Sequence, residues 1–92
     1  MSIVIVGGNE CMERQYKETC QAYGCSAKVF TRMKDGLKRK MGTPDLLVLF
    51  TNTTSHKMVR CALDGTKGMD TVIARSHSSS ISALKKILME HV

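Results

Sequence analysis

The chain has 92 residues and a net charge of +6, with 14 lysines and arginines against 8 acidic residues. A chain of this length has room for one domain, and a hydrophobic fraction of 42% excludes wholesale disorder. No tryptophan and only four other aromatic residues (two Tyr, two Phe) are present, which argues against base stacking on single-stranded nucleic acid.

The apolar runs are too short for a membrane span. The longest, residues 46–50, has the length of a strand, whereas a spanning helix needs roughly 18–20 residues. Residues 3–6 follow Met1 and Ser2 directly, without the basic stretch that opens a signal peptide. We therefore expect a cytoplasmic protein that does not enter a membrane.

The chain contains four cysteines, which would allow three disulfide connectivities: Cys11, Cys20, Cys25 and Cys61. Without a secretion signal we interpret them as reduced thiols. No two of them form a C-x-x-C pair, so zinc-ribbon and thioredoxin-type sites are excluded. Cys20 is expected to be a small buried hydrophobe on the inner face of a helix.

The first predicted unit is a strand followed by a helix. Residues 3–6 are a continuous β-branched and apolar run that ends at Gly7 and Gly8, typical of a strand buried on both faces. Asn9 is placed to cap the helix, and Gly24 to end it. The expected buried face of this helix repeats at helical spacing: Met12, Tyr16, Cys20 and Tyr23.

The second and third units repeat this pattern. Residues 27–31 alternate in polarity and predict an edge strand, on which Lys28 discourages aggregation. A short helix is predicted over residues 33–41, before a stop signal at residues 42–44. The third strand is predicted to start at residues 45–46 and to end at Phe50. The polar residues 51–55 supply N-caps for a helix that ends near Gly65 or Gly68.

The fourth strand is predicted over residues 71–74, with a loop over residues 75–80. The last helix carries a core stripe of Ile81, Leu84, Ile87 and Leu88. Four strand–helix units predict a parallel sheet with right-handed crossovers and helices on both faces. We expect a single α/β domain over residues 1–92, a small flavodoxin-like or Rossmann-like three-layer fold with strand order 2-1-3-4.

Parallel sheets of this kind bind ligands beyond the carboxyl ends of their strands, near the point where the strand order reverses. Glycines, arginines and polar residues gather in the four loops expected there. The alternative is that these loops only cap helices. The candidate cofactor-binding residues are Gly7, Gly8, Asn9, Arg32, Thr51, Asn52, Thr53, Ser55, Arg75, Ser76, Ser78 and Ser79.

Known phosphate-binding motifs are missing from these loops. Residues 7–12 lack the G-x-G-x-x-G spacing, and no G-x-x-x-x-G-K-[ST] motif occurs in the chain. Arg32 stands where an acid would bind a ribose, which argues against an ordinary NAD site. Phe50 ends the third strand where a phospho-acceptor receiver would need aspartate. Two arginines and the helix N-termini would still bind a small anionic ligand.

His56 and His77 are the most specific chemical pair, because they follow two strands expected to be neighbours. Both are candidate metal ligands that would bind a haem iron, and Cys11 is a weaker candidate. Arg32 or Arg75 would pair with the haem propionates. The alternative is that either histidine is merely a loop or capping residue.

Basic residues are concentrated in residues 28–40, where the local net charge is +5. One interpretation is an anionic partner, such as nucleic acid or a phosphorylated ligand. The other is a solvated helix face. Nothing else in the sequence supports nucleic-acid binding.

Three segments of the chain resemble the bacterial family called domain of unknown function 2325: residues 2–8, residues 51–58 and residues 75–80. The resemblance covers nearly the whole chain. It implies a small flavodoxin-like or Rossmann-like domain, favours haem binding, and carries over His56 and His77 as site residues. Relatives often carry histidine after the paired glycines, where this chain has Asn9, so ligation at that position would be altered or lost.

These observations favour a small non-catalytic protein that binds haem at the rim, by which we mean the loops beyond the carboxyl ends of the strands. Such a protein would have a redox or oxygen-stress role. The alternative is a module that binds a phosphate-bearing metabolite or nucleotide at the same rim. An enzyme ranks third, because no acid is placed to orient either histidine beside the rim serines. Residues 72–74 are apolar on an expected sheet edge, and they predict a homodimer through this strand or the last helix.

Overall fold

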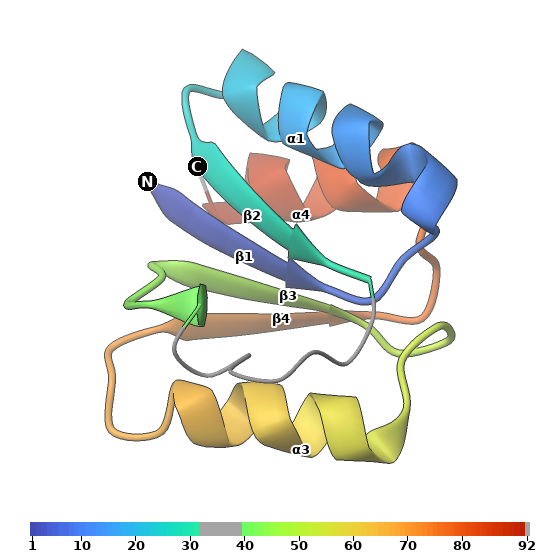
Figure 1. The fold of residues 1–92 in the computed structure, drawn as a ribbon. Coiled ribbons are helices and arrows are strands. Elements are labelled where there is room, and N and C mark those ends of the chain that lie inside the picture. Colours follow the sequence, from blue (N-terminus) through green and yellow to red (C-terminus); the bar gives the residue numbers. More distant parts are fainter. Residues whose placement is uncertain (32–39, 92) are drawn as a thin grey trace.

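The computed structural model describes residues 1–31 and 40–91. Its elements in chain order are β1 (Ser2–Val6), a 3₁₀ turn η1 (Glu10–Met12), α1 (Glu13–Ala22), β2 (Ser26–Phe30), β3 (Leu46–Phe50), α3 (His56–Gly65), β4 (Val72–Ser76) and α4 (Ile81–His91) (Figure 1). Arg32 and most of the helix predicted over residues 33–41 lie outside the described residues, as does most of the basic segment.

The four strands form one parallel sheet in the order β2-β1-β3-β4, which confirms the predicted topology. Helices α1 and α4 cover one face of the sheet, and α3 covers the other (Figure 1). The chain is therefore a small three-layer α/β domain. The strand order reverses between β1 and β3, so the two loops that follow these strands flank the switch point.

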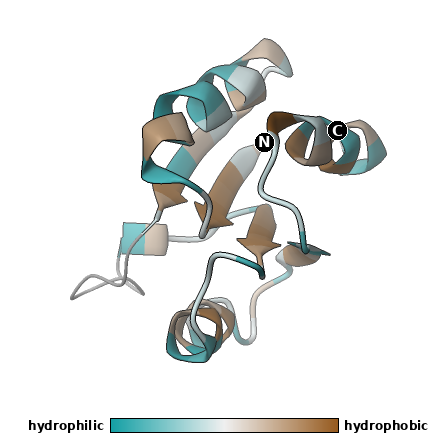
Figure 2. Cartoon of the chain, turned by 90° about the vertical axis from the view of Figure 1, so that its right-hand side faces the viewer, coloured by the Kyte–Doolittle hydropathy of each residue, from teal (hydrophilic) through white to brown (hydrophobic). Residues whose placement is uncertain are grey.

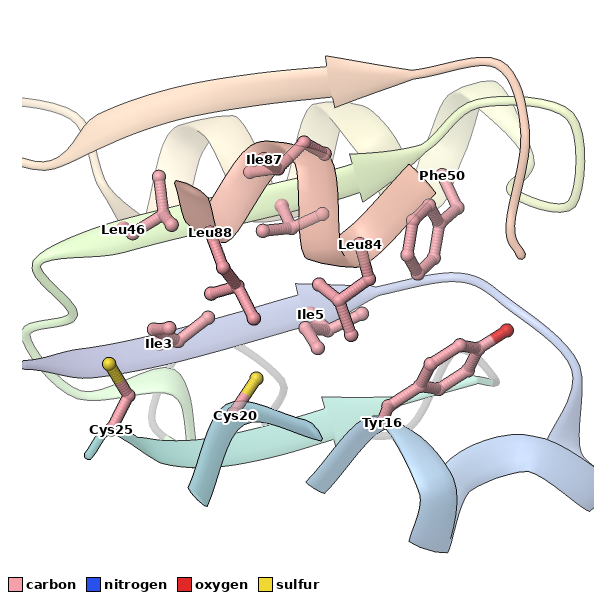
Figure 3. Close-up of a cluster of buried hydrophobic side chains, with 11 residues drawn as sticks. Ile3, Ile5, Tyr16, Cys20, Cys25, Leu46, Phe50, Leu84, Ile87 and Leu88 are labelled. Atoms are coloured by element: carbon pink, nitrogen blue, oxygen red, sulfur yellow. The ribbon is translucent and has the colours of Figure 1, made fainter. Parts of the chain in front are cut away.

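The two central strands supply the core because each is paired on both sides and covered on both faces. Alternate residues point to opposite faces, so Ile3 and Ile5 pack under α1 and α4, whereas Val4 and Val6 pack with residues of α3. Figure 2 shows these apolar strands between the helical layers. Figure 3 shows the larger cluster, in which Tyr16 and Cys20 of α1 and Leu84 and Leu88 of α4 lie on the same face of the sheet.

The predicted buried faces of α1 and α4 are confirmed at their central residues, whereas Met12, Tyr23 and Ile81 are only partly buried. Tyr16 and Cys20 are fully buried on α1, Met58 and Ala62 are buried on α3, and Leu84, Ile87 and Leu88 are buried on α4. Gly24 has a φ of 74°, the left-handed conformation expected of a residue that ends a helix. Ser55 caps α3 through a hydrogen bond from the Met58 amide.

Two predicted boundaries are wrong. β4 continues through Arg75 to Ser76, whereas the sequence placed both residues in the following loop. The extension follows the neighbouring strand, because Phe50 pairs with Ser76 and the Thr51 amide donates to the Ser76 carbonyl at 2.9 Å. The start of the first helix also differs from the prediction. Asn9 caps the turn η1, whereas α1 begins at Glu13.

The two edge strands differ in surface. Lys28 of β2 is exposed, as expected for a protected edge. On β4, Val72 and Ile73 are 47% and 41% exposed although they point to opposite faces of the sheet. The helical layers therefore leave the first two residues of β4 uncovered. No helix of the described segments is long and apolar enough to cross a membrane.

Candidate functional site

The carboxyl ends of the four strands lie at one edge of the sheet, because all the strands are parallel. Three described loops meet there: residues 7–9 after β1, residues 51–55 after β3 and residues 77–80 after β4. This edge is where sheets of this class bind ligands. The candidate residues of the described segments lie in these loops or at the end of β4, except for Cys11 in η1 and His56 at the start of α3.

The loop after β1 is held close to the loop after β3. Gly7 has a φ of 99°, and a β-carbon there would lie 2.9 Å from the carbonyl oxygen of Phe50 and overlap the Thr54 hydroxyl. The Gly8 amide donates to Oγ1 of Thr53 at 2.7 Å, and the Thr54 hydroxyl donates to the Phe50 carbonyl at 2.6 Å. Glycine at position 7 therefore serves a close approach of two backbones.

Several predicted site residues make hydrogen bonds within their own loops. The Asn9 side chain accepts from the Cys11 amide at 2.9 Å. Ser76 donates to the Ser78 carbonyl at 2.7 Å, and the Ser78 and Ser80 hydroxyls lie 3.1 Å apart. The capping alternative is thus the one that these contacts support for Asn9, Ser55, Ser76 and Ser78.

One hollow at this edge draws residues from three elements. Its volume is about 280 Å³, and its walls are formed by Thr51 and Thr54 of the β3 loop, His56 and Val59 of α3, and Arg75 of β4. Arg75 pairs in register with Leu49, on the face of the sheet that α3 covers. The structure therefore brings together three of the predicted site residues, Thr51, His56 and Arg75, in one hollow.

The polar groups of this hollow are largely available to a ligand. His56 and Arg75 are exposed, and neither side chain makes a hydrogen bond or ion pair with any described residue. The hydroxyl of Thr51 makes a long hydrogen bond of 3.4 Å to the Ser76 carbonyl. The N-terminal end of α3, with its first backbone amides, also lies at this hollow, and the helix dipole there favours negative charge. The hollow is therefore a positively biased site.

A second hollow of about 580 Å³ lies along α3 and shares His56 and Val59 with the first. It is bordered at helical spacing by His56, Lys57, Val59, Arg60, Leu63 and Asp64. His56 stands where the two hollows meet. Its position at the start of α3 follows from the Ser55 cap, which fixes where the helix begins.

Other candidate residues lie apart from these hollows. His77, Ser78, Ser79 and the exposed Cys11 border neither of them. No group of three or more His, Cys, Asp and Glu side chains within residues 1–31 and 40–91 is arranged to hold a metal ion. Thr54 and Val59 also form walls of the smaller hollow but were not among the predicted site residues, although Thr54 belongs to the polar loop of residues 51–55.

The match to known families covers almost the whole chain. The family model for domain of unknown function 2325, described as an uncharacterized protein conserved in bacteria, matches residues 2–91. Comparison with curated proteins and with solved structures gives no match. The chain therefore belongs to the bacterial family domain of unknown function 2325.

Proposed function

We propose that the hollow between His56 and Arg75 binds the anionic group of a small phosphate-bearing metabolite or nucleotide, without catalysing a reaction. The observation that carries this proposal is the position of Arg75, which lines the same hollow as His56 at the N-terminal end of α3. Arginine binds phosphate oxygens through two parallel N–H donors, which a single lysine ammonium does not reproduce.

The charge around the hollow supports an anion. Arg75 has no carboxylate partner among the described residues, and no acidic side chain borders the smaller hollow. The N-terminal amides of α3 and the hydroxyl of Thr51 add neutral donors that bind phosphate oxygens. A volume of about 280 Å³ lies just below the range of about 300–1,000 Å³ for whole small-molecule sites, so it suits the phosphate end of a ligand.

Calorimetric titration with inorganic phosphate, sugar phosphates and nucleotides tests this proposal. Arg75→Ala is expected to weaken binding at least tenfold, because a charge-assisted hydrogen bond contributes about 1.5–3 kcal/mol. Arg60→Ala is the matched control, since Arg60 is a second exposed arginine that borders only the larger hollow. The absence of heat across the panel, or equal effects of the two variants, would contradict the proposal.

Haem is the second candidate ligand, and the position of His56 at the junction of both hollows favours it. The larger hollow, at about 580 Å³, falls within the volume range of cofactor sites and has apolar walls at Val59 and Leu63. Lys57 and Arg60 border it as partners for propionates, and His56 would supply the iron ligand. Bound haem would supply redox or gas-binding chemistry. His77 borders neither hollow, so this fit rests on one histidine.

Absorption spectra of the protein titrated with haem separate the two candidates. If haem is the ligand, His56→Ala shifts the Soret band and lowers the affinity, whereas His77→Ala leaves both unchanged. An identical Soret band and affinity in His56→Ala would remove His56 as a ligand. The phosphate titration is independent of this result, because Arg75 does not border the larger hollow.

A further inference from the structure

The outer edge of β4 carries backbone groups that pair with nothing in the described chain. The Val72 amide donates to the Asp45 carbonyl, and the Ser76 carbonyl accepts from the Thr51 amide, so these residues and Ala74 between them point their backbone groups toward β3. Neighbouring residues of a strand point to opposite sides. The amides and carbonyls of Ile73 and Arg75 therefore face the free edge.

The side chains of this edge are also left uncovered. Val72 lies on the face under α1 and α4, and Ile73 on the face under α3, yet both are more than 40% exposed. Met69, which precedes the strand, is 39% exposed. The opposite edge strand β2 has no exposed large hydrophobic residue and carries Lys28. An apolar edge without such protection is a template for pairing with another strand.

We propose that β4 pairs antiparallel with β4 of a second copy of the chain, about a two-fold axis at Ala74, so that one sheet continues through both copies. This register is self-complementary. The outward residue Ile73 of each copy lies opposite the outward residue Arg75 of the other, and each pair exchanges two backbone hydrogen bonds. Axes at neighbouring residues overlap the five-residue strand less completely.

The side chains suit this pairing. Opposite residues of an antiparallel pair lie on the same face of the sheet, so the second copy's Ile73 packs against the aliphatic stem of Arg75. Arg75 lines the hollow together with His56, so this packing lies beside the hollow. Each copy thereby supplies one apolar residue next to the hollow of the other. Only this last consequence rests on the proposed function; the pairing itself does not.

Light scattering at micromolar to millimolar concentration tests the pairing. The unmodified protein is expected to have the mass of a dimer. Ile73→Pro removes one outward amide without removing a bond to β3, and proline is tolerated on edge strands when its nitrogen faces solvent. This variant is expected to be a monomer with an unchanged circular dichroism spectrum. A monomeric unmodified protein throughout the range would overturn the proposal.

The matched control is Val29→Pro on β2. The Ser26 amide and the Phe30 carbonyl both bond toward β1, so the Val29 amide also faces outward, at the other edge of the sheet. Val29→Pro is expected to remain a dimer. Equal loss of the dimer in both proline variants would contradict pairing through β4.

A crosslink tests the register even if Ile73→Pro fails to fold. Ala74 is expected opposite its own copy in a non-hydrogen-bonded pair, with Cα atoms about 4.5 Å apart, which is close enough for a disulfide. In a Cys11→Ser background, Ala74→Cys should oxidise to a covalent dimer, whereas Ala27→Cys on β2 should not. Failure of Ala74→Cys to crosslink, or equal crosslinking at both positions, would overturn the Ala74 axis.

Discussion

Tyr16 donates its hydroxyl hydrogen to the carbonyl oxygen of Ser79 at 2.6 Å, although the two residues are 63 positions apart in the chain. The same hydroxyl oxygen accepts the Asn9 amide at 3.3 Å. One buried phenol on α1 thus connects the loop after β1 with the loop that precedes α4. Tyr16 lines neither hollow at the rim. Its role there is to hold the two loops in position.

We expect Tyr16→Phe to lower the free energy of unfolding by about 1–3 kcal/mol, because a part-buried carbonyl and an amide both lose their partner. Urea denaturation followed by circular dichroism measures the change. Tyr23→Phe is the control, since the Tyr23 hydroxyl has no hydrogen bond among the described residues and its loss should cost little. Equal destabilisation by the two variants would show that the Ser79 and Asn9 contacts contribute nothing.

Gly7→Ala should destabilise the protein more than Gly24→Ala. Both glycines have positive φ, which costs a residue with a β-carbon about 1–2 kcal/mol. At Gly24 nothing lies within 4 Å of the added carbon, whereas at Gly7 it meets the Phe50 carbonyl at 2.9 Å. Thermal and urea denaturation of the two variants measure the difference. Equal losses of stability in the two variants would mean that the backbone at Gly7 moves away from the backbone at Phe50 at little cost.

Leu47→Ala should cost about 2–5 kcal/mol, because this fully buried leucine on the central strand β3 leaves a cavity between the sheet and α3. Met89→Ala should change the stability by less than about 0.5 kcal/mol, since Met89 is 72% exposed on α4. Urea midpoints for both variants check this contrast. A small effect at Leu47 would show that the α3 layer repacks.

Cys20 should be unreactive in the folded protein. Burial, and to a lesser extent the neighbouring Cys25, raises the pKa of its thiol to about 11, so little thiolate is present near neutral pH. Alkylation followed by mass spectrometry should modify the exposed Cys11 first, and Cys20 only after denaturation. Labelling of Cys20 at the rate of Cys11 would contradict this order.

The same shift predicts a loss of stability in alkaline solution. The unfolded thiol releases its proton near pH 9.0, whereas the folded thiol keeps it to about pH 11. The contribution of Cys20 is therefore complete below pH 9 and falls as the pH rises through about 11. Denaturation curves across this range should show a smaller decline for Cys20→Ala than for the unmodified chain.

The fold could be predicted from the sequence because each central strand is a short apolar run with a glycine or polar stop. The continuous run of β3 indicates burial on both faces, and the alternation of β2 indicates an edge. The end of β4 could not be found in this way. Arg75 and Ser76 have no apolar signal of their own, and they are extended because β3 offers them partners.

The edge of the sheet that carries the candidate residues could be predicted from the sequence. Which of these residues line the same hollow could not. The rim follows from the parallel topology, and polar loop residues mark it. Which of them line the same hollow depends on local hydrogen bonds and on the pairing of the strands in the folded chain. Asn9 and Ser78 bond within their own loops, whereas Arg75 reaches the His56 hollow through its register with Leu49. Local sequence patterns do not contain that register.

The unequal cover over the sheet has a consequence for hydrogen exchange. β3 is fully buried and hydrogen-bonded to strands on both sides, whereas β4 is bonded on one side and exposed at Val72 and Ile73. In the monomeric Ile73→Pro variant, the amides of β3 should therefore exchange only on global unfolding, while those of β4 exchange through a local opening that leaves the other three strands paired. Such an opening would carry Arg75 away from α3. The hollow would then be lost when β4 opens and restored when it closes, without unfolding of the domain.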